Sequence, residues 1–215
     1  MTGVLLHDAP TSSNAQKVRF MLAELGLAYE RRTVPFVAGA RPDWHLAVNP
    51  TGGIPALVDG DLHLAESNAI LRYLASRERR DDLYPTSLPD RARIDWLLEA
   101  VGMTLRPILR EVEGHAYGLR AGRGIGAAQP DLQAAAEALA RLRPRLEAFA
   151  ALLDPDGDFA CRGRFTLADV AGAPMLHRLR RSGLDLSDAP TRLIAWGEAV
   201  CTRPAWQPVA AESGV

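Results

Sequence analysis

The sequence predicts an α/β domain followed by an all-helical domain. Three observations point to this architecture. Strand and helix patterns alternate over residues 1–80, a proline-containing segment follows at 81–90, and helical periodicity dominates over 91–215. The chain of 215 residues is long enough for two small domains or one large domain with a buried core. We therefore expect two domains joined by a linker at 81–90.

The first domain combines short strands with amphipathic helices. The apolar residues after the first strand are spaced as on one helical face, and Asp59-Gly60 between two apolar runs is a strong hairpin signal. An irregular segment rich in Gly, Pro and Asn occupies 37–53. In order, we expect a strand at 3–7, a helix ending at Gly26, a strand at 28–36, two strands within 54–66 and a helix from about Ser67.

Two long apolar stripes predict the helices of the second domain. One runs over 94–112 and the other over 132–153, with steps of three and four residues. Pro107 and Pro144 lie inside these stripes, so we expect them to kink or divide the helices.

The segment FTLADV, residues 165–170, is a helix-start signal. Thr166 is placed as the N-cap and Asp169 three residues later completes a capping box, while Phe165 and Val170 are placed as a hydrophobic staple. A catalytic acid is the alternative reading of Asp169. We assign this carboxylate to folding.

Composition and charge exclude several classes of function. The hydrophobic content of 47%, the charged content of 24% and the net charge of -1 are those of an ordinary globular protein, with no basic surface for nucleic acid or anionic lipid. We see no signal-peptide pattern and no apolar run of membrane-spanning length. The five His and two Cys have no metal-ligand spacing, so we expect a metal-free, cytoplasmic protein.

A cluster of polar side chains stands where the first helix begins: Thr11, Ser12, Ser13 and Asn14. The N-terminus of a helix presents unpaired N–H groups that favour an anion. A hydroxyl there can donate a hydrogen bond to a thiolate. It would thereby favour ionisation of a thiol, whose ordinary pKa is about 8.5. The structural alternative is that these residues only cap the helix.

Three further features of the first domain could converge with this cluster. Ile54-Pro55 at a strand start is a candidate cis bond, which would turn the Ile54 backbone outward to pair with an extended peptide. Glu66 can accept from an ammonium group, and Ser67 at a helix start can hold a carboxylate. Arg41 is a carboxylate partner by charge. An ordinary turn, a helix cap and a solvated arginine are the structural alternatives. Together the features describe a pocket for an extended thiol peptide with two carboxylates.

Four segments carry a resemblance to the soluble glutathione S-transferases, specifically to their bacterial, serine-type, theta-, phi- or nu-like members: SSNAQKVRFMLAELGLAYE at 12–30, NPTGGIPALVDGDLHLAESNAILRYLA at 49–75, FTLADV at 165–170 and RPAWQ at 203–207. The resemblance covers nearly the whole chain. It implies a thioredoxin-like, glutathione-binding domain at 1–80 and a helical domain at 91–215 that contributes the electrophile pocket. It also implies glutathione as co-substrate, no metal, and a homodimer.

The resemblance also implies which hydroxyl contacts the sulfur of glutathione. One branch of the family uses a tyrosine at the end of the first strand and another a cysteine at the helix start, and this sequence has neither. In the serine branch, alignment on KVR at 17–19 places Ser12 at the catalytic position, with Ser13 second and Thr11 third. Pro55 matches the family's cis proline.

The expected reaction is conjugation of the glutathione thiolate to small hydrophobic electrophiles. Ser12 donates to the thiolate, while Ser13, Asn14, Arg41, Ile54, Pro55, Glu66 and Ser67 bind the peptide. We expect Arg41 to make more of the contact with the glycine carboxylate of glutathione, because Gly53 occupies a position where many relatives carry a side chain that reaches this carboxylate.

Other functions stay open. Asn14 aligns with an asparagine of members that reduce disulfides, and the double serine is similar to the zeta class, which isomerises maleylacetoacetate. A non-catalytic glutathione-binding module is the alternative outside enzymes. Trp96 and Met103 are candidates for the electrophile pocket but are assigned to the core.

Overall fold

A computed structural model of the protein describes residues 3–35, 41–119 and 125–215. Part of the irregular segment expected at 37–53 therefore lies outside the described residues. Within the described part of the chain, no helix is both long enough and apolar enough to cross a membrane.

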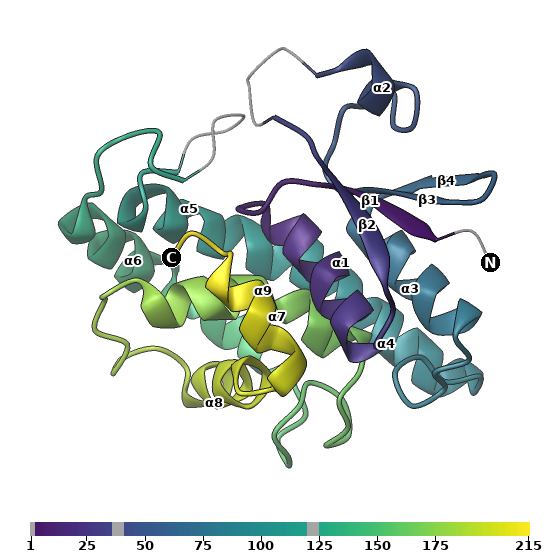
Figure 1. Ribbon diagram of the computed structural model, residues 1–215. Helices are drawn as coiled ribbons and strands as arrows, with labels where there is room; N and C mark the ends of the chain where they lie inside the picture. The colour runs from purple at the N-terminus through teal and green to yellow at the C-terminus, as the bar shows by residue number, and fades with distance from the viewer. Residues whose placement is uncertain (1–2, 36–40, 120–124) are drawn as a thin grey trace.

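The first domain contains a mixed four-stranded sheet in the order β2-β1-β3-β4 (Figure 1). β1 pairs in parallel with β2 and antiparallel with β3, which forms the predicted hairpin with β4. Gly60 at the hairpin turn has φ of 59°, which a glycine adopts without strain. The elements are β1 (Val4–Asp8), α1 (Ser13–Glu24), β2 (Tyr29–Thr33), α2 (Asp43–Leu46), β3 (Ala56–Asp59), β4 (Leu62–Ala65) and α3 (Ser67–Arg77).

The second domain is helical, as expected. Pro107 lies just after a π-helical segment that interrupts the α-helical pattern, although residues 88–116 are helical throughout. Pro144 instead lies inside one continuous helix. The elements are α4 (Leu88–Ala100), η1 (Val101–Leu105), α5 (Arg106–Ala116), α6 (Leu132–Ala150), α7 (Leu167–Arg181), α8 (Thr191–Cys201), η2 (Pro204–Trp206) and α9 (Gln207–Ala211). Helix α4 thus begins within the segment predicted to link the domains.

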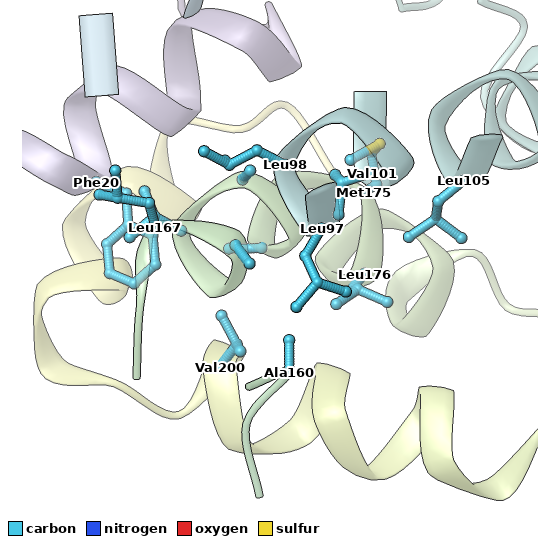
Figure 2. Close-up of a cluster of buried hydrophobic side chains, with 14 of the residues drawn as sticks. Phe20, Leu97, Leu98, Val101, Leu105, Ala160, Leu167, Met175, Leu176 and Val200 are labelled. Atoms are coloured by element: carbon cyan, nitrogen blue, oxygen red, sulfur yellow. The ribbon is translucent and has the colours of Figure 1, made fainter. Parts of the chain in front are cut away.

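Helix α7 is the centre of the packing between the domains. It contacts α4, α5 and α8 of its own domain and α1 and α3 of the first domain. Figure 2 shows side chains from several of these helices meeting in one cluster, including Phe20 of α1, Leu97 of α4 and Val200 of α8. In Figure 1, α1 and α3 lie between the sheet and the second domain, whereas α2 lies on the far side of the sheet.

The structure confirms the capping box and corrects one expectation about the core. The side chains of Thr166 and Asp169 make the reciprocal bonds of the box, and Asp169 is fully buried. Trp96 and Met103, in contrast, are not core residues, because 49% and 76% of their surfaces are exposed. The buried positions of the α4–η1 segment are taken by residues such as Leu97 and Val101. Met103 instead lines a cleft between the two domains.

Candidate functional site

A cleft of about 400 Å³ lies where the first turns of α1 and α3 meet the α4–α5 segment of the helical domain. It brings together three of the predicted site residues, Asn14, Glu66 and Ser67. Ser12, Ser13, Arg41, Ile54 and Pro55 do not line it. The full lining is Asn14, Lys17, Glu66, Ser67, Asn68, Ala69, Arg72, Glu99, Gly102, Met103 and Arg106.

Ser12 is the N-cap of α1, directly before the first helical residue. Its Oγ accepts a hydrogen bond from the backbone N–H of Ala15 at 3.4 Å, so the capping interpretation is confirmed. Capping uses the oxygen lone pair and leaves the hydroxyl hydrogen, for which no acceptor exists among the described residues. Ser12 is half-buried, whereas its neighbour Ser13 is 7% exposed. One hydroxyl can therefore cap the helix and donate to an anion at the same time.

The turn that carries Ser12 is held by side chains from both domains. The carbonyl of Pro10 accepts from Nη2 of Arg19 at 2.7 Å, and the carbonyl of Thr11 accepts from Nη2 of Arg178 on α7 at 2.5 Å. Arg178 is itself buried and paired with Glu113 at 3.1 Å. Burial raises the pKa of Glu113 and the adjacent guanidinium opposes that rise. The helical domain thus fixes the backbone next to Ser12.

Glu66 and Ser67 begin α3 in an unusual conformation. Glu66 has φ of 64°, in the left-handed region that non-glycine residues rarely adopt and that is enriched at ligand-binding sites. It stands at the N-cap position, yet no side chain caps this helix. Ser67 is the first helical residue and is buried. Because helix capping does not occupy either side chain, both are available to a ligand in the cleft.

Ile54 precedes a cis peptide bond to Pro55, as anticipated. The Ile54 backbone makes no hydrogen bond to the described residues, so it can pair with an extended peptide. The preceding carbonyl, that of Gly53, accepts from Nδ2 of Asn49 at 2.8 Å and lies 3.1 Å from Nε2 of His45. These two side chains hold the loop before the cis bond, a role that the sequence did not indicate.

His45 belongs to a buried pair with His7. Their Nδ1 atoms are 3.0 Å apart, so one ring must donate to the other, which requires at least one of them to be neutral. Burial, and then the proximity of His45, lower the pKa of His7 to about 4. The pair joins the end of β1 to the loop around Gly53.

The structure does not bring Arg41 to the cleft. Its Nε donates to the carbonyl of Gly52 at 2.9 Å and its Nη1 donates to the carbonyl of Pro35 at 2.7 Å. The predicted contact of Arg41 with a carboxylate therefore stays a prediction, and in this conformation the guanidinium stabilises the loop.

Three cationic residues of the cleft, Lys17, Arg72 and Arg106, were missed from the sequence. Lys17 lies on the face of α1 that also carries Asn14, three residues away, and Arg106 begins α5 on the opposite wall. A charged residue within the buried face of an amphipathic helix is the signal that could have identified Lys17. Among the described residues, no group of three or more His, Cys, Asp or Glu side chains could hold a metal ion.

In the comparison with known proteins, two separate family models match the two parts of the chain. The family models described as the N-terminal and C-terminal domains of glutathione S-transferase match residues 6–82 and 133–199. The chain is 33% identical to glutathione S-transferase 3 of Zea mays, covering 96% of this chain and 93% of that one. It is 35% identical to a maleylacetoacetate isomerase of Rhizobium meliloti, covering 86% of each chain.

A solved structure of glutathione S-transferase-I bound with lactoylglutathione superimposes with a TM-score of 0.81 at 28% identity, covering 98% of this chain and 100% of that one. The arrangement of a thioredoxin-like domain and a helical domain is therefore common to both chains. On the matched domains, the full-length relatives and the shared architecture, this protein belongs to the glutathione S-transferase family.

Proposed function

We propose that this protein transfers the thiolate of glutathione to small hydrophobic electrophiles. The observation that carries the proposal is the Ser12 hydroxyl, which caps α1 through its oxygen and keeps its hydrogen for a sulfur anion at the helix start. The hydrogen bond and the helix dipole lower the pKa of the bound thiol, whose proton passes to solvent. The thiolate then forms a carbon–sulfur bond with the electrophile as the leaving group departs with its electron pair.

The remaining site residues position the peptide. In the proposed complex, Glu66 accepts from the α-ammonium group of the γ-glutamyl residue, and Ser67 donates to its carboxylate. The Ile54 backbone pairs with the peptide beside the cis bond to Pro55. Catalysis comes from positioning and from lowering the thiol pKa, and no covalent bond to the protein is needed.

The test of this function compares three proteins in two assays: retention on immobilised glutathione and conjugation to an activated aryl halide. We expect the wild type to be retained and active. Ser12→Ala should lower turnover by about tenfold or more, because one hydrogen bond to a charged group contributes about 1.5–3 kcal/mol. Ser13→Ala, which removes the second candidate for the sulfur contact, should lower turnover less than Ser12→Ala does.

Three outcomes would change the assignment. A silent Ser12→Ala with an inactive Ser13→Ala would move the sulfur contact to Ser13. Retention without conjugation would favour a binding module, and turnover of a glutathione mixed disulfide would then favour disulfide reduction. Failure of the folded wild type to bind glutathione would refute the proposal.

A second candidate is isomerisation of maleylacetoacetate. It is favoured by the identity of 35% to a protein of that name and by the adjacent hydroxyls of Ser12 and Ser13. A loss of the absorbance of maleylacetoacetate in the presence of catalytic glutathione would support isomerisation. If the protein is only a transferase, the absorbance should fall no faster than it does without the protein.

We also propose a cytoplasmic homodimer, with the outer side of α4 as the contact between copies. Leu88 and Trp96 on this side are large apolar residues that are 77% and 49% exposed, an arrangement more typical of a covered surface than of a solvated helix. Trp96→Glu should shift the protein toward monomer in sedimentation velocity. An unchanged dimer would place the interface elsewhere.

A further inference from the structure

The side chain of Lys17 is buried and has no partner among the residues that the structure describes. Its surface is only 2% exposed, and its side chain forms no hydrogen bond or ion pair with any described residue. A buried ammonium group in this condition is costly unless an anion compensates it. It lines the same cleft as Ser67 and Glu66. It is also the only lysine in the sequence, since the other 24 of the 25 basic residues are arginines.

Two cationic side chains of the cleft, Lys17 and Arg106, have no ion-pair partner among the described residues. On the α3 side the cleft carries Glu66 and Arg72, and on the helical-domain side Glu99 and Arg106. Arg72 is paired with two carboxylates, since its Nη2 lies 2.9 Å from Oε1 of Glu99 and its Nε lies 2.6 Å from Oδ1 of Asp95. Among the side chains that line the cleft, Lys17 and Arg106 are then the basic groups, and Glu66 the carboxylate, that have no ion pair to a described residue. The side chain of Arg106, like that of Lys17, has no hydrogen bond to a described residue, and its Nε is buried.

This charge pattern complements an α-amino acid head group. The ammonium and carboxylate groups of an α-amino acid are attached to one carbon, so a ligand whose ammonium group binds Glu66 must place its carboxylate in the same cleft. Ser67 can offer that carboxylate a hydroxyl and a backbone N–H, but neither supplies charge. Lys17 can supply it.

We propose that Lys17 binds the α-carboxylate of the γ-glutamyl residue of glutathione, together with Ser67. This inference rests on the proposed function, because it names a further residue of the same ligand site. It makes Lys17 a determinant of specificity for the zwitterionic head group.

Binding of the carboxylate at this site is coupled to protonation of Lys17. Burial, followed by the nearby Arg106, lowers the pKa of Lys17 to about 7, while Glu99 and Glu66 act in the opposite direction. In the empty cleft Lys17 is therefore partly neutral at neutral pH. A bound carboxylate stabilises the ammonium form and raises the pKa, so binding takes up a proton. The affinity should fall as pH rises above about 7, by up to tenfold per pH unit until the pKa of the complex is reached.

The experiment uses S-hexylglutathione, which has no thiol and so removes the ionisation of sulfur from the measurement. Selective labelling with lysine carrying ¹³C at the ε-carbon gives one internal resonance in the full-length protein, because Lys17 is the only lysine. We expect this resonance to titrate near pH 7 without ligand and at least one pH unit higher with S-hexylglutathione. Calorimetry in two buffers of different ionisation enthalpy should show proton uptake at pH 8.

Variants add an independent measurement. Lys17→Met should weaken binding of S-hexylglutathione at pH 6.5 by about tenfold or more and abolish its pH dependence. Lys17→Arg should preserve binding and flatten the pH dependence, since a guanidinium stays protonated. Arg145→Met, which removes an exposed cation that does not line the cleft, is the matched control and should bind as the wild type does.

The outcomes separate this inference from the function on which it rests. If wild type binds S-hexylglutathione but the Lys17 resonance does not move, the inference is wrong and the transferase proposal stands. If an analogue lacking the γ-glutamyl α-carboxylate produces the same shift, Lys17 binds a different group. If folded wild type does not bind S-hexylglutathione, both proposals fail. Should Lys17→Met not fold, the resonance of the wild type still decides.

Discussion

Asp169 is the residue whose replacement should weaken the fold most clearly. Its carboxylate is fully buried below the N-terminus of α7. Oδ1 accepts from the N–H of Ala160 at 2.8 Å and from Nε1 of Trp196 at 2.7 Å, and Oδ2 accepts from the N–H of Thr166 at 2.7 Å. The Thr166 hydroxyl is a fourth donor at 3.0 Å. One side chain thus joins the helix start to the preceding loop and to α8.

Asp169→Ala would leave the three N–H donors in the interior without an acceptor. Each buried donor left unpaired costs about 1–3 kcal/mol, which sums to about 3–9 kcal/mol. Removing a buried carboxylate also relieves its desolvation, the effect that raises the pKa of Asp169 in the fold. We therefore expect the lower half of that range, about 3–5 kcal/mol. An ordinary N-cap contributes only about 0.5–2 kcal/mol.

Urea unfolding at pH 7, followed by circular dichroism at one protein concentration, measures this loss. With a slope of about 1–3 kcal/mol per molar urea, the midpoint should fall by about 1 M or more. The exposed Asp158→Ala is the matched control and should change the free energy of unfolding by no more than about 0.5 kcal/mol. A loss below about 1 kcal/mol for Asp169→Ala would refute the reasoning. Lost activity with an unchanged midpoint would show that Asp169 acts in catalysis.

Two further changes test the interior. The fold favours the neutral form of His7, so the free energy of unfolding should fall by at most about 3 kcal/mol as pH drops from about 6.5 to about 4. His7→Gln cannot become charged beside His45. Denaturant titrations of this variant should therefore show a free energy of unfolding that depends less on pH. Gly172→Ala would place a Cβ 2.5 Å from the Trp196 ring and should lower the melting temperature through a loss of about 1–3 kcal/mol. Gly114→Ala, whose Cβ would meet no described atom closer than 3.9 Å, should not.

The features predicted well from the sequence depend on local chemistry. The Asp59-Gly60 hairpin needs only a turn that accepts positive φ, and the capping box at Thr166 needs only residues three apart. The N-cap of α1 at Ser12 is local in the same sense. In each case the interacting groups are close in sequence, so spacing and residue type identify them.

The features missed from the sequence depend on contacts between distant segments. The pairing of His7 with His45 spans 38 residues, and no pattern in the sequence joins them. The periodicity of α4 places Trp96 near the apolar stripe but does not show that this side of the helix faces outward. Lys17 lies within an apolar helical face, and only the assembled cleft shows that its side chain is buried without a partner among the described residues.

The hydrogen bond from Arg178 to the carbonyl of Thr11 matters for chimeras that combine domains of related proteins. A first domain transplanted onto another helical domain would lose this donor unless the new α7 carried an arginine at the same place. The turn bearing Ser12 would then gain freedom even though every residue of its own domain were intact. Chimeras of this protein should therefore regain activity only when the arginine and its partner Glu113 are transplanted together.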